Sequence, residues 1–227
     1  MDTRVKVTFD KDFADRQPDY RTLLIEADVT NSNTGEALKA ELDALARDIG
    51  RKYKVEDINK IPAVAATRAA YKACGKDPNR YRPSQEQMIR RIVRGLGLYY
   101  VNSLVDAGNI LSLRSGCAVG CFDADKIDGD VITLGIGKEG ESYEGIGRGE
   151  LNIAGLPVFR DRKGGFGTPT SDNVRTCIEL PTKRILVTVH LFDREIDADK
   201  VLQLFTDLFT RFCGATDIHS TVFNVQV

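Results

Sequence analysis

The sequence predicts a single α+β domain with its helices gathered on one side of a sheet. Three observations favour this class. Four segments before residue 116 carry apolar residues at helical spacing. After Gly116, glycines come every few residues and separate short apolar runs, a pattern typical of short strands joined by tight turns. No internal repeat, linker or low-complexity segment divides the 227 residues.

The first elements are expected to be two strands followed by two helices. Residues 5–9 alternate apolar and polar side chains, and residues 23–29 form a second, more apolar run. Residues 31–33 then supply cap and turn chemistry for a helix that is expected to end at Gly50. A further helix is expected over residues 61–74.

The remaining elements are predicted from caps, glycines and apolar runs. Residues 84–87, Ser-Gln-Glu-Gln, have the form of a capping box and open a third helix. A fourth is expected over residues 102–115. Residues 183–192 contain the best candidate for a central strand. Asp197 begins the last helix, and residues 221–225 form a final strand.

The composition is that of an ordinary soluble globule, with 42% hydrophobic and 29% charged residues. Lys and Arg number 32 against 33 Asp and Glu, so bulk charge does not favour coating of nucleic acid, and RNA contact would need a local basic patch. No apolar stretch approaches the roughly 20 residues that cross a bilayer, and no secretory signal opens the chain. With five cysteines, these features favour free thiols in a reducing cytoplasm.

Several kinds of chemistry are excluded or disfavoured. The chain has no glycine loop with Lys-Ser/Thr that would bind nucleotide phosphates, and the glycine-rich residues 145–149 favour a hairpin or bulged turn over a dinucleotide site. Cys117 and Cys121 have no second ligand pair at useful distance, which disfavours zinc. A nucleophilic pair of Cys177 or Cys117 with His190 is also disfavoured, because nothing local brings the two side chains together.

Basic residues cluster between residues 72 and 94, opposed only by Asp77 and Glu86. Such a cluster either forms a solvated helix face or contacts RNA, in which case nearby tyrosine rings would stack on bases. The candidate RNA-binding residues are Arg80, Arg82, Arg90, Arg91 and Arg94, and the tyrosines are Tyr81, Tyr99 and Tyr100.

The densest polar segment, here called the polar loop, covers residues 164–176. It holds four hydroxyl groups, a carboxylate, an amide and a guanidinium behind glycines that let a backbone approach a ligand closely. Such a loop either binds a small polar group and positions a water molecule or is a well-capped surface turn. The residues alone leave both interpretations open.

Several short motifs resemble a known family in their order and spacing. Residues 102–109 end in Val-Asp-Ala-Gly-Asn, residues 121–130 contain Phe-Asp-Ala-Asp-Lys-Ile-Asp-Gly, and residues 138–141 are Lys-Glu-Gly-Glu. They resemble the helix, strand-and-turn and acidic motifs of the B3/B4 editing domain of the phenylalanyl-tRNA synthetase β subunit. The resemblance covers about half of the chain, from about residue 81 to residue 190.

The resemblance implies a three-layer β/β/α fold with a mixed sheet and helices on one side. It implies one domain over residues 1–227, with an N-terminal elaboration (1–80), a core (81–192) and a C-terminal helix and strand (193–227). In the synthetase this domain hydrolyses tyrosine mischarged onto phenylalanine tRNA. The expected partners are therefore the aminoacylated acceptor end of a tRNA and a small amino-acid-like ligand, without DNA, membrane, metal or cofactor.

The resemblance transfers residue by residue as follows. The family's helix Asp and Asn match Asp106 and Asn109, its pocket threonine falls at Gly108, and its pocket histidine falls at Gly120. Its glutamate that binds the tyrosine hydroxyl corresponds to Glu179 or Thr188, depending on where a gap is placed, and its glycine-rich pocket wall corresponds to residues 165–168.

Two hypotheses follow. In the first, the protein is a free-standing deacylase that edits mischarged tRNA in trans; the chain is too short to be a complete tRNA ligase. In the second, it is a non-catalytic module that binds RNA or an amino-acid-like small molecule. Under the first hypothesis, the residues that bind the aminoacyl group and hold the water are Thr168, Thr170, Ser171 and Asp172. The rest of the predicted pocket consists of Asn109, Arg114, Arg148, Gly165, Phe166, Gly167 and Arg175.

Overall fold

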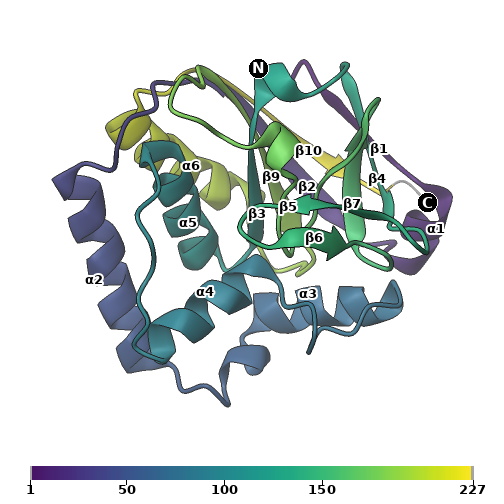
Figure 1. Cartoon of the computed structure of the whole chain (residues 1–227), viewed down its shortest axis with the longest axis horizontal. Helices are drawn as coiled ribbons and strands as arrows, with labels where there is room; N and C mark the ends of the chain where they lie inside the picture. The colour runs from purple at the N-terminus through teal and green to yellow at the C-terminus, as the bar shows by residue number, and fades with distance from the viewer. Residues whose placement is uncertain (1, 226–227) are drawn as a thin grey trace.

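The computed structural model describes residues 2–225, so residues 1 and 226–227, at the ends of the expected domain, lie outside the described chain. The helices are α1 (Lys11–Arg16), α2 (Glu36–Lys52), α3 (Pro62–Ala73), α4 (Ser84–Val93), α5 (Ser103–Ser115) and α6 (Ala198–Cys213) (Figure 1). The strands are β1 (Lys6–Phe9), β2 (Arg21–Asp28), β3 (Ala118–Asp123), β4 (Val131–Ile136), β5 (Ser142–Gly145), β6 (Gly149–Asn152), β7 (Pro157–Asp161), β8 (Gly164–Gly167), β9 (Arg184–Leu191) and β10 (Thr216–Asn224).

The strands form two stacked sheets and a hairpin. The central sheet has the order β10–β2–β9–β3, and each of its neighbouring pairs is antiparallel. The outer sheet has the order β1–β4–β7–β8 and is mixed, because β1 pairs parallel with β4 while the other pairs are antiparallel. Strands β5 and β6 form a separate hairpin, as residues 145–149 predicted.

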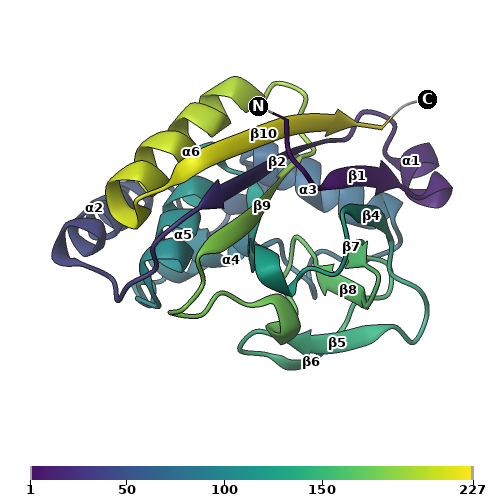
Figure 2. The ribbon, with the colours of Figure 1, turned by 90° about the horizontal axis from the view of Figure 1, so that it is seen from above.

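Helices α2, α4, α5 and α6 cover one face of the central sheet, and the outer sheet lies on its other side (Figure 2). The alternation of β2 explains this arrangement. Leu23, Ile25 and Ala27 pack into the core shared with the helices, whereas Leu24 points into the core between the sheets. The α+β class and the three-layer arrangement with a mixed sheet are therefore confirmed.

Two predicted details near α2 are wrong. Gly50 does not end α2, which continues to Lys52. A Cβ atom at Gly50 would lie 3.8 Å from Ile92 of α4, so the glycine lies where the two helices approach each other. Asn31 does not cap α2 either, since its Oδ1 accepts hydrogen bonds from the hydroxyl of Ser103 and the backbone N–H of Leu104, at the start of α5.

The predicted capping box at α4 is also wrong. Ser84 is the first helical residue, after Pro83 at the N-cap, and no side chain caps this end. The N–H of Ser84 donates instead to the carbonyl of Pro169 in the polar loop, at 2.7 Å. The amide of Gln87, which would complete the box, donates to the carbonyls of Arg82 and Thr170. The start of α4 is thus stabilised by tertiary contacts, which a local motif cannot reveal.

Other boundaries follow local signals. Asn102 caps α5, its Oδ1 accepting from the N–H of Val105, and Asp197 caps α6 in the same way. Strand β10 begins at Thr216, earlier than the predicted residue 221. The first half of this edge strand is partly exposed and has a bulge after Thr216, so it lacks the apolar pattern of a buried strand. No helix within residues 2–225 is both long and apolar enough to cross a membrane.

Candidate functional site

The polar loop begins with β8 at the edge of the outer sheet, and its remaining residues turn back towards the helices. Thr168, which is buried, closes this turn: its hydroxyl donates to the carbonyl of Ser171 at 2.7 Å and accepts from the backbone N–H groups of Thr170 and Ser171. The hydroxyl of Tyr143, in the β5–β6 hairpin, donates to the carbonyl of Ser171 at 2.6 Å. The Thr168 hydroxyl therefore serves the turn itself.

Contacts from α3 and α4 fix the middle of the loop. The hydroxyl groups of Thr170 and Tyr71 lie 2.8 Å apart, and both side chains are buried. Gln87 of α4 donates to the carbonyl of Thr170 at 3.1 Å and to that of Arg82 at 2.6 Å. The loop is thus a docked, largely buried turn. The hydroxyls of Thr168 and Thr170 satisfy other protein groups, so they position the backbone rather than face a ligand.

Asp172 differs from these threonines. Its side chain is half-buried, and within residues 2–225 no side chain hydrogen-bonds to its carboxylate. Its backbone is fixed, because its carbonyl accepts from the N–H of Ile146 and the residue bridges to Gly167. Burial raises the pKa of Asp172 to about 8, against the opposing effect of a backbone hydrogen bond from Thr168.

The carboxyl of Asp161 shows how pairing with an arginine changes the pKa of a partly buried aspartate. Burial by itself would raise the pKa of Asp161, but the bidentate hydrogen bonds from Arg175, both 2.9 Å, and two backbone N–H groups hold it below its usual range. Asp172 has no such cation. It is therefore the carboxyl of the loop that can exchange a proton near neutral pH.

Gly167 lies against Asp172, and the ring of Phe122 lies between Gly167 and a second glycine, Gly120. A Cβ atom at Gly167 would lie 2.5 Å from the ring of Phe122 and 3.3 Å from Oδ1 of Asp172. A Cβ at Gly120 would lie 2.6 Å from the same ring and 2.9 Å from the hydroxyl of Thr188. The ring of Phe122 therefore fills the space beside both glycines. We call Gly120, Phe122, Gly167, Asp172 and Thr188 the Asp172 site.

Thr188 and Glu179 are the two positions that the resemblance left open for the family glutamate, and they differ in their surroundings. It pairs with Gly120 across β9 and β3, is fully buried, and has a hydroxyl without a hydrogen-bond partner in the described chain. Glu179 is exposed instead and forms an ion pair with Lys126. Of the two residues, Thr188 is therefore the one that lies beside Gly120.

On the helix side, α5 packs closely against β3 at Gly108. A Cβ at Gly108, the position of the family threonine, would lie 2.8 Å from the sulfur of Cys121, and burial raises the pKa of this thiol. Asn109 follows on α5 and is half-buried. Asp106 is fully buried and accepts from the hydroxyl of Thr34 at 2.6 Å, so it anchors the segment before α2.

Other predicted pocket residues lie elsewhere. Arg114 pairs with Glu41 of α2 at 2.9 Å and lines a cavity of about 350 Å³ whose lining includes no residue of the polar loop. Arg175 is occupied by Asp161. The ring of Phe166 is fully buried against Phe122, with centroids 4.9 Å apart, so it belongs to the core. Gly165 accepts from the amide of Asn173, and exposed Arg148 donates to Gln87 at the edge of the loop.

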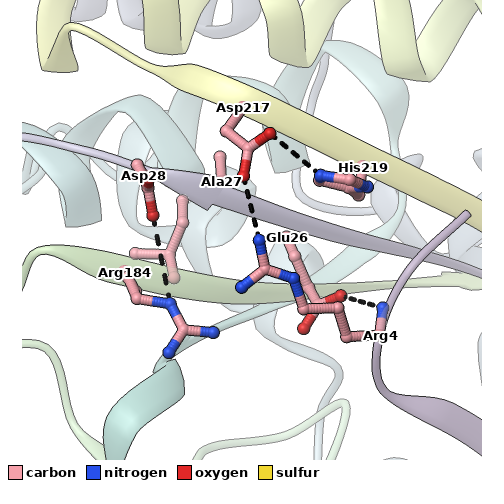
Figure 3. A pocket seen from close by; sticks show the side chains of 8 residues that line it. Arg4, Glu26, Ala27, Asp28, Arg184, Asp217 and His219 are labelled. Carbon is pink, nitrogen blue, oxygen red and sulfur yellow. Dashed lines mark hydrogen bonds and ion pairs between the residues drawn. The ribbon is translucent and has the colours of Figure 1, made fainter. Parts of the chain in front are cut away.

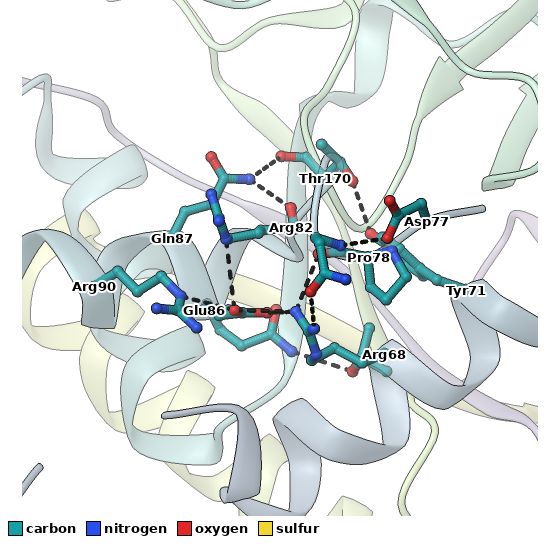
Figure 4. A network of polar contacts seen from close by, with 12 residues as sticks. Arg68, Tyr71, Asp77, Pro78, Arg82, Glu86, Gln87, Arg90 and Thr170 are labelled. Atoms are coloured by element: carbon teal, nitrogen blue, oxygen red, sulfur yellow. Dashed lines mark hydrogen bonds and ion pairs between the residues drawn. The ribbon is translucent and has the colours of Figure 1, made fainter. Parts of the chain in front are cut away.

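The basic cluster divides into two parts. Glu86, fully buried, binds Arg68 at 3.0 Å and Arg90 at 2.8 Å, with Arg82 at 3.8 Å (Figure 4). We call these four residues the Glu86 cluster. Arg91 instead donates to the carbonyl of Gly97 and lies over the ring of Tyr99. Arg80 and Arg94 are exposed. The sequence missed Arg68 and the role of Glu86, because their contacts join separate helices.

The described residues offer little for a metal ion. Within residues 2–225 no three His, Cys, Asp or Glu side chains are grouped to hold one. His190 lies 2.7 Å from the hydroxyl of Tyr20, and burial lowers its pKa to about 3.

In a charged pocket at the end of the central sheet, Arg4 already has partners within the protein. Its guanidinium pairs with Asp217 at 3.0 Å, and its backbone N–H donates to Glu26 (Figure 3).

Comparison with known proteins places the chain. The family model described as the B3/4 domain matches residues 66–223, more than half of the chain. The phenylalanine–tRNA ligase beta subunits of Bartonella henselae and Bartonella quintana are each 29% identical over 136 and 135 residues. Each match covers 58% of this chain but spans only 17% of the relative.

A solved structure also resembles the chain. It is an N-terminal fragment of the phenylalanyl-tRNA synthetase beta subunit from Pyrococcus horikoshii, at 14% identity and a TM-score of 0.48, covering 96% of this chain and 51% of that one. The family assignment rests on the sequence match over residues 66–223. The chain belongs to the B3/4 domain family.

Proposed function

We propose that this protein hydrolyses the ester bond of a mischarged aminoacyl-tRNA in trans, with Asp172 as the general base. Membership of the B3/4 family and the likeness to tRNA ligase beta subunits support tRNA as the partner. The observation that carries the proposal is the half-buried carboxyl of Asp172, whose pKa of about 8 lies close to neutral pH.

The proposed step uses water as the nucleophile. The ionised carboxylate of Asp172 takes a proton from the water as its oxygen attacks the ester carbonyl carbon. The tetrahedral intermediate then collapses, and the bond to the ribose oxygen breaks. That oxygen receives the proton that Asp172 took from the water. A pKa near the working pH suits a group that must both accept and return a proton.

The remaining loop residues have revised roles under this proposal. Thr168 and Thr170 are positioning residues, because their hydroxyls hold the turn that carries Asp172. Ser171 is the adjacent hydroxyl that remains a candidate for substrate contact, since its side chain is half-buried and its carbonyl holds the Tyr143 hydroxyl. Arg148 contacts the loop only indirectly, because it donates a hydrogen bond to Gln87, which in turn donates to the carbonyl of Thr170.

The test is single-turnover hydrolysis of a panel of mischarged tRNAs, with Asp172→Asn as the variant. We expect ester loss above the spontaneous rate for at least one tRNA, and loss of that activity in the variant. The rate should rise with pH and level off above about 8, because the base acts when ionised. Absence of hydrolysis with every tRNA, or an unchanged rate in Asp172→Asn, would refute the proposal.

One observation favours a second candidate function, a non-catalytic binding module. Glycine replaces two family pocket side chains at Gly108 and Gly120, and Cys121 and Phe122 fill the space beside them. A thermal-shift comparison separates the two functions. A module for amino-acid-like ligands would be stabilised by free amino acids and unaffected by tRNA, whereas the deacylase would be stabilised by tRNA.

A further inference from the structure

We propose that Arg82 and Arg90, which lie with Arg68 around buried Glu86, form a phosphate-binding site for the backbone of a polynucleotide. The proposal rests on the proposed function in taking tRNA as that polynucleotide. The phosphate site goes beyond the proposed function, because it names the residues that contact the tRNA backbone and assigns to Glu86 the role of a positioning residue. Arg91, which lies in the same basic stretch, is not part of the site.

The charge of the Glu86 cluster is not balanced. Three guanidinium groups share one carboxylate, which leaves two positive charges. Two of the three cations are largely withdrawn from water, with side chains 13% exposed for Arg68 and 16% for Arg90. Like charges gathered in a partly buried place repel each other, and a bound anion offsets that repulsion.

The cluster also keeps hydrogen-bond donors unused. Arg90 donates to Glu86 through Nε, and no bond joins its two terminal nitrogens to another described residue. The side chain of Arg82 is 42% exposed and makes only the 3.8 Å ion pair with Glu86. The fully buried side-chain atoms that lack partners within residues 2–225 are on Gln85 and Thr188, so the unpaired nitrogens of Arg82 and Arg90 are not sealed from solvent. Guanidinium groups match the geometry of phosphate oxygens.

The site is pre-organised by its surroundings. Arg68 binds both oxygens of Glu86 and also donates to the carbonyl of Pro78 and the amide of Asn79. These contacts join α3, α4 and the segment between them, so the guanidinium groups are held before a ligand arrives. Less side-chain entropy is then lost on binding.

The site adjoins the polar loop. Gln87 joins the carbonyl of Arg82 to that of Thr170 (Figure 4). Arg148 of the β5–β6 hairpin donates to the same glutamine. A phosphate bound by Arg82 and Arg90 would therefore lie beside the loop that carries Asp172. This is the relationship expected between a nucleic-acid backbone contact, which fixes register, and the group that receives the end of the strand.

The test measures binding of uncharged tRNA to the full chain by fluorescence anisotropy at several salt concentrations. We expect Arg82→Gln and Arg90→Gln each to weaken binding and to reduce the slope of log K against log salt by roughly 1. Arg51→Gln is the matched control, because it removes the same charge from an exposed position on α2. Equal effects of Arg82→Gln, Arg90→Gln and Arg51→Gln would overturn the proposal.

Glu86→Gln separates positioning from bulk charge. The substitution makes the protein more positive by one charge, so bulk attraction alone predicts tighter binding. Positioning predicts weaker binding, because the arginines lose the carboxylate that orients them. Tighter binding by a folded Glu86→Gln protein would refute the positioning role. If this variant does not fold, the two arginine substitutions still decide the proposal.

Two further arms identify the source of the phosphate and separate this proposal from the deacylase. Inorganic phosphate should compete only at concentrations far above those of tRNA. Competition at similar concentrations would indicate a site for free anions and would overturn the proposal that the ligand is a polynucleotide. Asp172→Asn should bind uncharged tRNA like the unmodified protein. Failure of hydrolysis with intact, Arg82-dependent binding would then refute the proposed function while supporting the phosphate site.

Discussion

The hydroxyl group of Tyr71 in α3 lies 2.8 Å from that of Thr170 in the polar loop, and both side chains are buried. The two residues are 99 positions apart in the chain. Together with Gln87 and Tyr143 they hold the turn that carries Asp172. Five predictions follow from this arrangement and from the groups around it, beyond the tests given with the proposals.

Tyr71→Phe should destabilise the protein by about 1–3 kcal/mol, because it leaves the buried hydroxyl of Thr170 without its partner. The free energy of unfolding in urea measures the effect. Tyr99→Phe is the matched control, since the Tyr99 side chain is 71% exposed and should lose less than about 0.5 kcal/mol. Equal stability of the two variants would contradict the role given to Tyr71.

Gly120→Ala should destabilise the protein by about 1–3 kcal/mol, because the new methyl group would lie 2.6 Å from the ring of Phe122. Gly50→Ala should instead stabilise it by about 0.5–1 kcal/mol. That glycine lies inside α2, and its nearest neighbour would be 3.8 Å away. Chemical denaturation of both variants tests the pair, and a stabilising Gly120→Ala would show that Phe122 does not fill the site.

Asp172 should make stability fall as pH rises. Its folded pKa of about 8 lies above the ordinary value of 3.8, so between these pH values the folded state binds more protons than the unfolded state. The contribution is present below pH 4 and is lost as pH rises towards 8. The stability of Asp172→Asn relative to the unmodified protein should therefore increase from pH 5 to pH 8. A difference that is constant over this range would contradict the raised pKa.

His190 should have the opposite effect, at acidic pH. Burial lowers its pKa from 6.5 to about 3, so below pH 6.5 the unfolded state binds more protons and stability falls as pH falls. Urea unfolding at pH 7, 6, 5 and 4 should show a smaller loss for His190→Phe/Tyr20→Phe, which removes the imidazole and its partner hydroxyl together. An NMR titration of the His190 ring signals that shows protonation near pH 6.5 would disprove this.

Arg114→Gln should leave tRNA hydrolysis unchanged within about twofold, although the sequence predicted Arg114 as a pocket residue. The side chain pairs with Glu41 and lines a cavity without polar-loop residues. Stability should change by less than about 1 kcal/mol, as for other partly exposed ion pairs. A loss of kcat comparable to that in Asp172→Asn would place Arg114 at the reacting ester after all.

Much of the fold follows from short-range signals. Asn102 caps α5 through a residue three positions on, and Gly116 ends it in the left-handed conformation at φ 74°. Such contacts are complete within one helical turn, so the sequence is sufficient to predict them. The apolar run of β9 likewise predicts a strand that is buried on both faces.

Local signals failed where distant groups supply the partner. Ser84 and Gln87 have the spacing of a capping box, but Pro169 accepts the hydrogen bond from the Ser84 N–H, and the Gln87 amide donates to the carbonyls of Arg82 and Thr170. Pro169 and Thr170 lie far from α4 in the sequence, so these contacts depend on how the chain returns to α4.

The candidate site divides along the same line. The sequence by itself determined the α+β class, the family resemblance and a polar loop containing Asp172. Only the tertiary structure decided that Thr168 and Thr170 serve the turn, that Thr188 lies beside Gly120, and that Arg114 and Arg175 have other partners. The physical reason is that solvation and hydrogen-bond partners set the chemistry of a side chain, and here those partners come from segments far apart in the chain.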